Sequence, residues 1–497
     1  MTNKYICVHG HFYQPPREDP WTGAVEAEPS AAPFHDWNER IAKECYEANT
    51  RAPILNPKGE VTRRVNNFSL ISFDIGPTLL SWIRRHNPDT YDAILDADRE
   101  SVRRNGGHGN ALAQAYNHLI MPLASRRDKV TQVLWGIRDF EFHYRRRPEG
   151  FWLPETAVDR ETLEILADCG IGFTVLAPHQ AYRRRRIGFN SRWEYLRHEC
   201  VDPRHAYRIL LDGRHFHVFF YDGGISRAIA FDGLLYNGDN LVNRLMGAFM
   251  RRDRTSQLVS TATDGESFGH HHPFGEMAVA YGLKKVEALG LAEITNFAAF
   301  LDRTGSPWEV DIYENSSWSC SHGVERWRSD CGCRLSHEAG WNQKWRSPLR
   351  EGLDTLKERL DRAYETVAGL LLKDPWQARN DYIDVLLEAD TKRRFLAGHA
   401  RGTIDAAGQA VVFDLLESQK YAMFMFTSCG WFFDDISGIE ARYVLKFAKR
   451  AIQLAAPYAA RDLEQTFIKK LAQAKSNLPG KGTGADIYNG LEADHGL

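Results

Sequence analysis

Short apolar runs that end in polar or glycine-rich loops recur through the first 290 residues. Residues 4–8 (KYICV) and 217–221 (HVFFY) are two such runs, and runs of this kind are typical of buried parallel strands. Between the runs lie stretches with apolar residues at helical spacing, such as 77–86 and 126–144. This alternation of strands and helices predicts an α/β domain with a barrel-like architecture.

One segment predicts a complete strand–helix–strand unit. Residues 150–154 (GFWLP) form the end of a strand, and Asp159 is suited to cap the helix that follows. Gly170 takes the position just after that helix, where a left-handed residue is common. Residues 171–176 (IGFTVL) then form the next strand.

The pattern changes near residue 291, beyond which helical spacing dominates. Residues 349–372 and 439–454 are the clearest examples. We therefore expect a catalytic barrel over residues 1–290 and a mainly α-helical C-terminal domain over residues 291–476. The glycine-rich tail, residues 477–497, is expected to be flexible.

Composition narrows the choice of ligand and location. The 497 residues include 63 basic and 65 acidic ones, for a net charge of -2, so no strong field attracts nucleic acid or an anionic membrane. No run of about 18 apolar residues predicts a membrane span. The first residues (MTNKYICVHG) lack the apolar core of a secretory signal. We expect a cytoplasmic protein whose 8 cysteines are reduced thiols.

Two acidic residues stand where predicted strands end. Glu155 follows GFWLP, and Asp264 follows the β-branched run STAT and precedes Gly265, Glu266 and three histidines. Carboxylates at the C-terminal ends of barrel strands are usual catalytic groups. The competing interpretations are a helix-capping Glu155, a solvated loop at Asp264, or a metal site formed with the histidines.

Two other predicted strand ends are rich in hydrogen-bonding side chains. The first strand runs into His9, His11 and Gln14, and the segment 108–118 ends in Tyr116, Asn117 and His118. Neutral donors and acceptors beside aromatic rings suit an uncharged, polyhydroxylated substrate. We therefore expect a polysaccharide or oligosaccharide as partner, whereas the oligomeric state is left open.

Four segments, in this order along the chain, resemble glycoside hydrolase family 57. They are HGHFYQPP from His9, GHGN with YNHLIMPL within 107–123, GFWLPE ending at Glu155, and TATDGESFGHHH ending at His272. The resemblance implies an α/β fold, an incomplete (β/α)7 barrel followed by a mainly α-helical domain. It also implies an α-glucan enzyme, such as an amylase, a 4-α-glucanotransferase or a branching enzyme. The C-terminal part resembles an uncharacterised helical domain carried by one subgroup of the family.

The resemblance assigns roles to particular residues. It implies that Glu155 is the nucleophile and Asp264 the general acid/base. A retaining enzyme of this kind forms a glycosyl-enzyme and then transfers the sugar to water or to another sugar, so the carboxylate pair does not choose between hydrolysis and transfer. The residues expected to bind substrate are His9, His11, Gln14, His118, Trp152, Glu266, His270, Trp318 and Trp431. Phe12 and Tyr13 stand between His11 and Gln14, where many members have a shorter H-x-H-Q-P.

The C-terminal region contains a group of potential metal ligands. Cys320, His322, Cys331 and Cys333 are close in sequence, but they lack the paired C-x2-C spacing that is typical of zinc sites. Buried thiols are the simpler interpretation, and we assign neither a metal nor a cofactor. The acidic pair Asp434 and Asp435 is expected to cap the following helix.

Two other functions remain open from the residues alone. A metal-dependent polysaccharide deacetylase or mannosidase-like enzyme on a related barrel would take its ligands from His9, His11, Asp264 and His270. A non-catalytic glycan-binding protein would not need both Glu155 and Asp264. We favour the carboxylate enzyme, with glycogen or maltodextrins as its expected substrate.

Overall fold

A computed structural model describes residues 3–188, 191–196, 201–251, 253–336 and 338–491. Contacts divide the chain into two compact units, each discontinuous in sequence. Unit 1 comprises Met1–Gln14, Ala27–Gln114 and His143–Trp318. Unit 2 comprises Pro15–Glu26, Ala115–Phe142 and Ser319–Leu497. The predicted domains, a barrel over residues 1–290 and a helical domain over residues 291–476, divide the chain at one point, unlike these units. That division stays a prediction.

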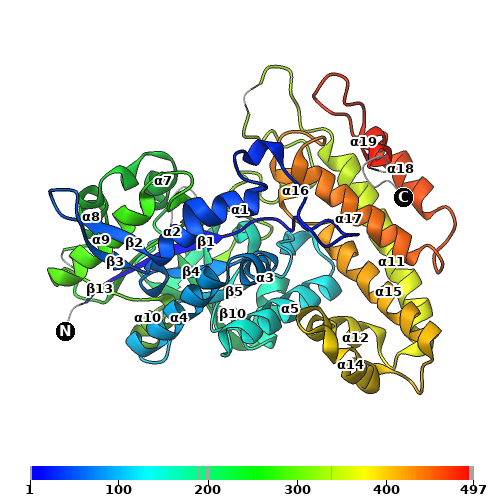
Figure 1. The fold of residues 1–497 in the computed structure, drawn as a ribbon. Coiled ribbons are helices and arrows are strands. Elements are labelled where there is room, and N and C mark those ends of the chain that lie inside the picture. Colours follow the sequence, from blue (N-terminus) through cyan, green and yellow to red (C-terminus); the bar gives the residue numbers. More distant parts are fainter. Residues whose placement is uncertain (1–2, 189–190, 197–200, 252, 337, 492–497) are drawn as a thin grey trace. The chain divides into compact units, whose positions relative to one another are not determined.

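The main sheet of unit 1 is entirely parallel among the described strands. Its path runs β12–β1–β4–β5–β6, and β13 also pairs with β1. Strands β1, β4, β5 and β13 of this sheet are labelled in Figure 1. The strands are β1 (Lys4–Phe12), β4 (Ser72–Ile75), β5 (Ala111–Gln114), β6 (Phe151–Trp152), β12 (Gln257–Asp264) and β13 (Glu293–Ile294). The predicted incomplete barrel is confirmed.

Helices connect these parallel strands, as crossover connections require. The longer ones are α3 (Pro77–His86), α4 (Pro88–Arg104), α6 (Arg160–Asp168), α7 (Gly223–Phe231), α8 (Gly238–Gly247), α9 (Gly275–Ala288) and α10 (Phe297–Thr304). The short helices α1 (Trp37–Ile41) and α2 (Glu47–Thr50) follow β1. The predicted unit around α6 is confirmed, because the Asp159 side chain accepts a hydrogen bond from Thr162 N and Gly170 has φ 83°.

A second, mixed sheet and a hairpin complete unit 1. The sheet order is β7–β11–β10–β14–β8–β9. Its strands are β7 (Phe173–Leu176), β8 (Ala181–Arg186), β9 (Glu194–Tyr195), β10 (Ala206–Leu211), β11 (Arg214–Phe220) and β14 (Trp308–Ile312), and the hairpin pairs β2 (Ala52–Leu55) with β3 (Val61–Val65). The shared core contains Cys7, Leu258, Phe173 and Phe219. The apolar strand interiors therefore anchor the sheets, and the polar side chains gather at the strand ends.

Unit 2 is mainly helical, as predicted. It contains most of α5 (Arg126–Tyr144), with α11 (Arg346–Leu371), α12 (Pro375–Asp381), α13 (Ile383–Leu387), α14 (Lys392–His399), α15 (Ala406–Phe424), α16 (Cys429–Phe432), α17 (Ile439–Ala455), α18 (Leu463–Leu471) and α19 (Gly484–Gly490). Helix α19 lies within the tail that we expected to be flexible, and residues 492–497 of that tail lie outside the described part.

The expectation that Asp434 and Asp435 cap a helix is wrong. Helix α17 has Gly438 as its N-cap and receives no side-chain cap. Asp434 instead accepts hydrogen bonds from the backbone of Leu335, and Asp435 accepts them from Ser437 and Ser476. Both carboxylates therefore tie loops together, because the chain turns before the helix begins.

None of the described helices is both long and apolar enough to cross a membrane.

Candidate active site

His11 stands between two carboxylates on neighbouring strands. In the parallel register, His11 of β1 lies opposite Asp264 of β12 on one side and opposite Asp74 of β4 on the other. Parallel strands present their carboxyl ends at one edge of a sheet, so the three side chains belong to the same edge. This edge is the usual place for an active site in a barrel of this kind.

Asp74 binds both histidines of the first strand. Its Oδ2 lies 2.7 Å from His11 Nδ1, and its Oδ1 lies 3.1 Å from His9 Nε2. His9 Nδ1 also lies 3.1 Å from Ser72 Oγ. Burial opposes ionisation of Asp74, yet the two imidazoles hold its pKa below the ordinary value. Asp74 is therefore a buried anion that orients both rings.

The same contacts give the two histidines different charge states. Burial favours neutral His11, but the charges of Asp74, Asp264 and Glu266 raise its pKa to about 9. Burial dominates at His9 and lowers its pKa, because Asp74 offsets the desolvation only in part and the His11 cation adds repulsion. At neutral pH the site thus holds one imidazolium, on His11, and one neutral imidazole, on His9.

Asp264 is accessible to solvent at the end of β12, although the residues before it on the strand are buried. Close protein surroundings still desolvate its carboxyl group and raise its pKa. The His11 cation opposes this rise, and the Asp74 anion adds to it. Asp264 is therefore a carboxyl group that solvent can reach and whose protonated form is favoured relative to an ordinary aspartate.

Glu266 lies two residues beyond Asp264 and is almost fully buried. Its Oε1 accepts hydrogen bonds from the Tyr46 hydroxyl at 2.7 Å and from the Tyr13 peptide N–H at 3.1 Å. Burial and the neighbouring charge of Asp264 raise the pKa of Glu266 to about 7, against these hydrogen bonds. The charge of Asp264 therefore acts directly on the proton affinity of Glu266.

Glu155 follows β6 in a left-handed backbone conformation, with φ 58° and ψ 20°. This region is uncommon for a residue with a side chain and costs about 1–3 kcal/mol. The indole N–H of Trp318 donates to Glu155 Oε2 at 2.9 Å, and the Trp318 peptide N–H donates to the Glu155 carbonyl at 3.0 Å. A half-buried Trp318 therefore holds both the side chain and the backbone of Glu155.

Aromatic contacts connect the Glu155 side of the site to the histidine side. The Trp318 ring lies 6.3 Å, centroid to centroid, from the ring of His11 and 6.3 Å from the ring of Tyr221. The charge of Asp264 acts on both of these residues, since it raises the pKa of each. Glu155 and Asp264 thus lie around the same small group of side chains.

Comparison with known proteins identifies the chain. The family model described as "Glycosyl hydrolase family 57" matches residues 8–305, which is more than half of the sequence. The chain belongs to glycosyl hydrolase family 57. It is accordingly a glycoside hydrolase or transferase. A second model, a domain of unknown function (DUF3536), matches residues 341–493 of this family 57 protein. No curated protein matches the sequence.

Solved structures share the fold of this family 57 chain. An exo-type maltose-forming amylase from Pyrococcus sp. ST04 has a TM-score of 0.71 and 16% identity, with 97% of this chain and 90% of that chain covered. A branching enzyme from Thermococcus kodakaraensis has a TM-score of 0.56 and 13% identity, with 99% and 94% covered. An α-amylase from Thermotoga maritima has a TM-score of 0.51 and 10% identity, with 98% and 99% covered.

Trp152 supports the family 57 site from within the core. Its ring is fully buried and stacks against His9 at 4.6 Å and against His11 at 5.3 Å between centroids. Its indole N–H has no hydrogen-bond partner among the described residues. The expected contact of Trp152 with substrate stays a prediction, whereas its contact with both imidazoles is direct.

The other predicted residues of unit 1 lie around this centre. Gln14 is half-buried and donates from Nε2 to the Tyr13 carbonyl at 3.0 Å. His270 is half-buried, and its Nδ1 lies 2.5 Å from Glu44 Oε2. The expected contacts of Gln14 and His270 with substrate stay predictions.

His118 and Trp431 belong to unit 2. His118 is buried in a left-handed conformation, φ 59°, with Nδ1 2.7 Å from Ser428 Oγ. Trp431 is 1% exposed, and its indole N–H donates to the Arg346 carbonyl. Both side chains therefore have structural partners within their own unit. Their expected contacts with substrate stay predictions.

Three residues of the site did not stand out in the sequence. Asp74 raises the pKa of Asp264, Tyr46 donates a hydrogen bond to Glu266, and the charge of Asp264 acts on Tyr221. Gln114, within the polar segment 108–118, ends β5 almost fully buried, with neither amide atom partnered among the described residues. Asp74 could have been found, because an acid inside the apolar run SFDI at a strand end needs a partner. The two tyrosines carry no such signal.

The metal-ligand set considered for a deacetylase-like enzyme does not gather around one point. Among the described residues, one group of histidine, cysteine or carboxylate ligand atoms is close enough together to hold an ion. It lies in unit 2 and consists of Cys320, His322, Cys331 and Cys333. In unit 1, His9 and His11 instead share Asp74, and His270 contacts Glu44.

Proposed function

We propose that this enzyme cleaves or transfers the glycosidic bonds of α-glucans through a glycosyl-enzyme on Glu155, with Asp264 as general acid/base. One observation carries the proposal: the surroundings of the two carboxylates differ in the sense that a retaining mechanism needs. Glu155 accepts a hydrogen bond from the Trp318 indole, while the pKa of Asp264 is raised. Retention requires one ionised nucleophile and one protonated acid.

Glu155 suits the nucleophile because its environment stabilises and aims the carboxylate. The Trp318 indole occupies Oε2 as a donor, which favours the anionic form. In the proposed reaction this carboxylate attacks the anomeric carbon. The left-handed backbone conformation of Glu155 lies directly after β6. A strained residue held by two hydrogen bonds is a typical feature of a functional site.

Asp264 suits the acid/base because its charge state responds to the charges beside it. Desolvation by the surrounding protein and the Asp74 anion favour the protonated form, which donates to the leaving oxygen. The His11 cation favours the ionised form, which then accepts a proton from the incoming hydroxyl. The same carboxyl group can therefore act first as an acid and then as a base.

The substrate class follows from the family and from the related structures. Those of similar fold include a maltose-forming amylase, an α-amylase and a branching enzyme, and these names support an α-glucan as substrate. A net charge of -2 and the aromatic rings of Trp152, Trp318 and Tyr221 at the site are compatible with an uncharged glucan. The acceptor decides between hydrolysis, where it is water, and transfer, where it is a sugar hydroxyl.

Incubation of the purified chain with amylose, glycogen and maltooligosaccharides tests this proposal. We expect new reducing ends or redistributed chain lengths, and the first product observed by NMR should have the α configuration. Glu155→Gln should lower the rate by at least about 1,000-fold. Gln180 is buried, so Gln180→Glu is not a suitable control. Exposed Glu194→Gln is the matched control. A β-configured first product would exclude retention, and inactivity on every α-glucan would exclude the substrate class.

A further inference from the structure

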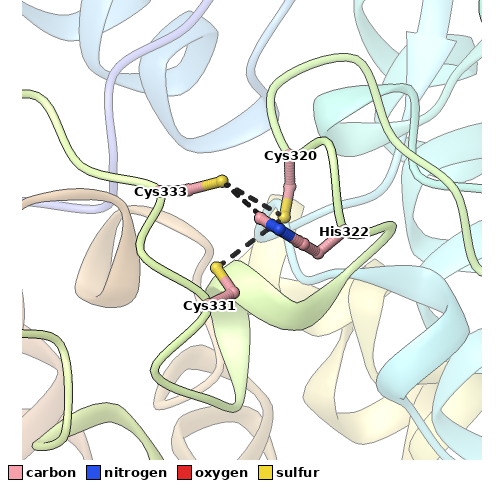
Figure 2. Close-up of side chains that lie close together, drawn as sticks. All are labelled: Cys320, His322, Cys331 and Cys333. Atoms are coloured by element: carbon pink, nitrogen blue, oxygen red, sulfur yellow. Dashed lines mark hydrogen bonds between the residues drawn. The ribbon is translucent and has the colours of Figure 1, made fainter.

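Three cysteines and one histidine converge on a single point in unit 2. The Sγ atoms of Cys320, Cys331 and Cys333 and a ring nitrogen of His322 all lie within 4.8 Å of one another (Figure 2). The Cys320 and Cys331 sulfurs are 3.9 Å apart, and the Cys333 and Cys320 sulfurs are 3.7 Å apart. Cys333 Sγ lies 3.6 Å from His322 Nδ1. The four side chains therefore surround a space that is about one ion wide.

These separations match the edges of a tetrahedron around zinc. With a zinc–sulfur distance of about 2.3 Å, two thiolates on a tetrahedral ion lie about 3.8 Å apart. The two sulfur–sulfur distances of 3.9 and 3.7 Å lie near this value, the sulfur–nitrogen distance is 3.6 Å, and all four ligand atoms lie within 4.8 Å of one another. A disulfide would require two sulfurs at about 2.0 Å, and it would leave the third cysteine and the histidine unexplained. We propose that Cys320, His322, Cys331 and Cys333 bind one structural Zn²⁺ ion.

The donor set selects this metal and this kind of site. Three thiolates with one imidazole are soft and borderline ligands, which favour zinc over calcium, magnesium or manganese. Four protein ligands fill a tetrahedral ion and leave no position open for a reacting water, as in structural sites. An iron–sulfur cluster would hold its thiolates farther apart, since inorganic sulfide and several irons would stand between them.

The local backbone explains how an irregular spacing still forms a site. Gly332, between Cys331 and Cys333, has φ 81°, so the chain reverses and both thiols point to the same side. The loop between the two ligand pairs contains η9 (Glu325–Trp327), and Trp327 is 1% exposed. A buried indole thus anchors the loop in place of the hairpin that paired C-x2-C ligands usually form.

A buried cation beside the cluster fits a negatively charged metal site. Zn²⁺ with three thiolates and a neutral imidazole carries a net charge of −1. The Arg346 side chain is fully buried, and its Nη1 donates to the Cys333 carbonyl at 2.9 Å. Arg326 Nη1 donates to the Ser319 carbonyl at 3.1 Å. Hydrogen bonds to the ligand-bearing backbone are the outer-shell contacts that orient metal ligands.

Metal analysis of the full-length chain, with any affinity tag removed, tests the site. We expect about one zinc per chain in the wild type and a loss of at least about tenfold in Cys331→Ser. Cys169→Ser removes a half-buried thiol of unit 1 and should keep the metal. Full zinc occupancy in Cys331→Ser would overturn the assignment of the ligands.

A second measurement keeps the proposal testable if Cys331→Ser fails to fold. Wild-type protein stripped with a chelator is titrated with Co²⁺, and we expect one equivalent to produce the intense visible bands of tetrahedral, thiolate-bound cobalt, which zinc then abolishes. The absence of zinc as purified, together with the absence of these bands, would overturn the proposal. A disulfide among Cys320, Cys331 and Cys333 in peptide mass spectra of freshly purified protein would overturn it as well.

Discussion

Trp318 donates two hydrogen bonds to Glu155, one from its indole to Oε2 and one from its peptide N–H to the carbonyl. The indole bond goes to a charged group, and such bonds contribute about 1.5–3 kcal/mol. Trp318→Phe keeps an aromatic side chain and the peptide N–H but removes the indole donor. We expect kcat/KM on amylose to fall about 10–100-fold, mostly in kcat, if the bond serves the reacting carboxylate.

Steady-state kinetics on Trp318→Phe and on Trp308→Phe check this prediction. Trp308 lies in β14 of the same unit and is half-buried, so it controls for the general loss of an indole. An unchanged kcat in Trp318→Phe, or an equal loss in both variants, would contradict a role for the indole in holding Glu155.

His11 makes stability depend on pH in a defined window. Its pKa of about 9 in the folded chain exceeds the ordinary value of 6.5, so its contribution is fully present below about pH 6.5 and is lost as the pH rises through about 9. Between these pH values, the free energy of unfolding of the wild type should fall by about 3 kcal/mol more than that of His11→Gln.

Urea unfolding at several pH values measures this difference. The surface variant His215→Gln should follow the wild-type pH dependence, because His215 is exposed. If His11→Gln lost stability with pH as steeply as the wild type, the imidazolium at His11 would be excluded as the cause.

Glu266 reports the charge on its neighbour. Asp264 helps to raise the pKa of Glu266 to about 7, so Asp264→Asn should shift that pKa downwards. Infrared difference spectra across pH follow the carboxyl band, and Glu266→Gln identifies which band belongs to Glu266. Asp239→Asn, which removes an exposed carboxylate elsewhere in unit 1, should leave the pKa unchanged. An unchanged pKa in Asp264→Asn would show that the two carboxyl groups are not coupled.

A buried ion network is expected to stabilise unit 2. Asp128 accepts from Arg379 Nη1 at 2.7 Å and from Lys357 Nζ at 3.2 Å. The charge and hydrogen bonds of these cations lower the pKa of Asp128 to about 2, although burial opposes this. Asp128→Ala leaves the cations short of a partner and should cost about 3–5 kcal/mol. Thermal or urea unfolding measures the loss. If Asp128→Ala lost no more stability than Asp390→Ala, which changes an exposed residue, the stabilising role of this ion network would be contradicted.

The sheet and the two strand-end acids were predictable because their signals are local. An apolar run followed by a polar loop identifies β1, β6 and β12 without tertiary information. Glu155 and Asp264 then follow from their positions at the ends of β6 and β12. Family resemblance added their roles, which position alone does not supply.

The supporting contacts were not predictable, since they join residues far apart in the chain. Trp318 and Glu155 are separated by 163 positions, and the sequence indicated only that Trp318 could stack on a sugar. The apolar run around Asp74 indicates that this acid needs a partner, but it does not identify His9 and His11 as the partners. The discontinuous units also have no sequence signal, because Pro15–Glu26 and Ala115–Phe142 resemble ordinary loop and helix segments of the barrel.

Azide rescue tests the assignment of the two carboxylates most directly. Glu155→Ala and Asp264→Ala are assayed with an α-glucosyl fluoride or an activated α-maltooligosaccharide, with and without azide. In Glu155→Ala, azide should replace the missing nucleophile and give a β-glycosyl azide. In Asp264→Ala, azide should attack the glycosyl-enzyme on Glu155 and give an α-glycosyl azide. Azide products of the opposite configurations would contradict the proposed roles. The absence of both azide products would also contradict them, provided that the variants are folded and still bind the substrate.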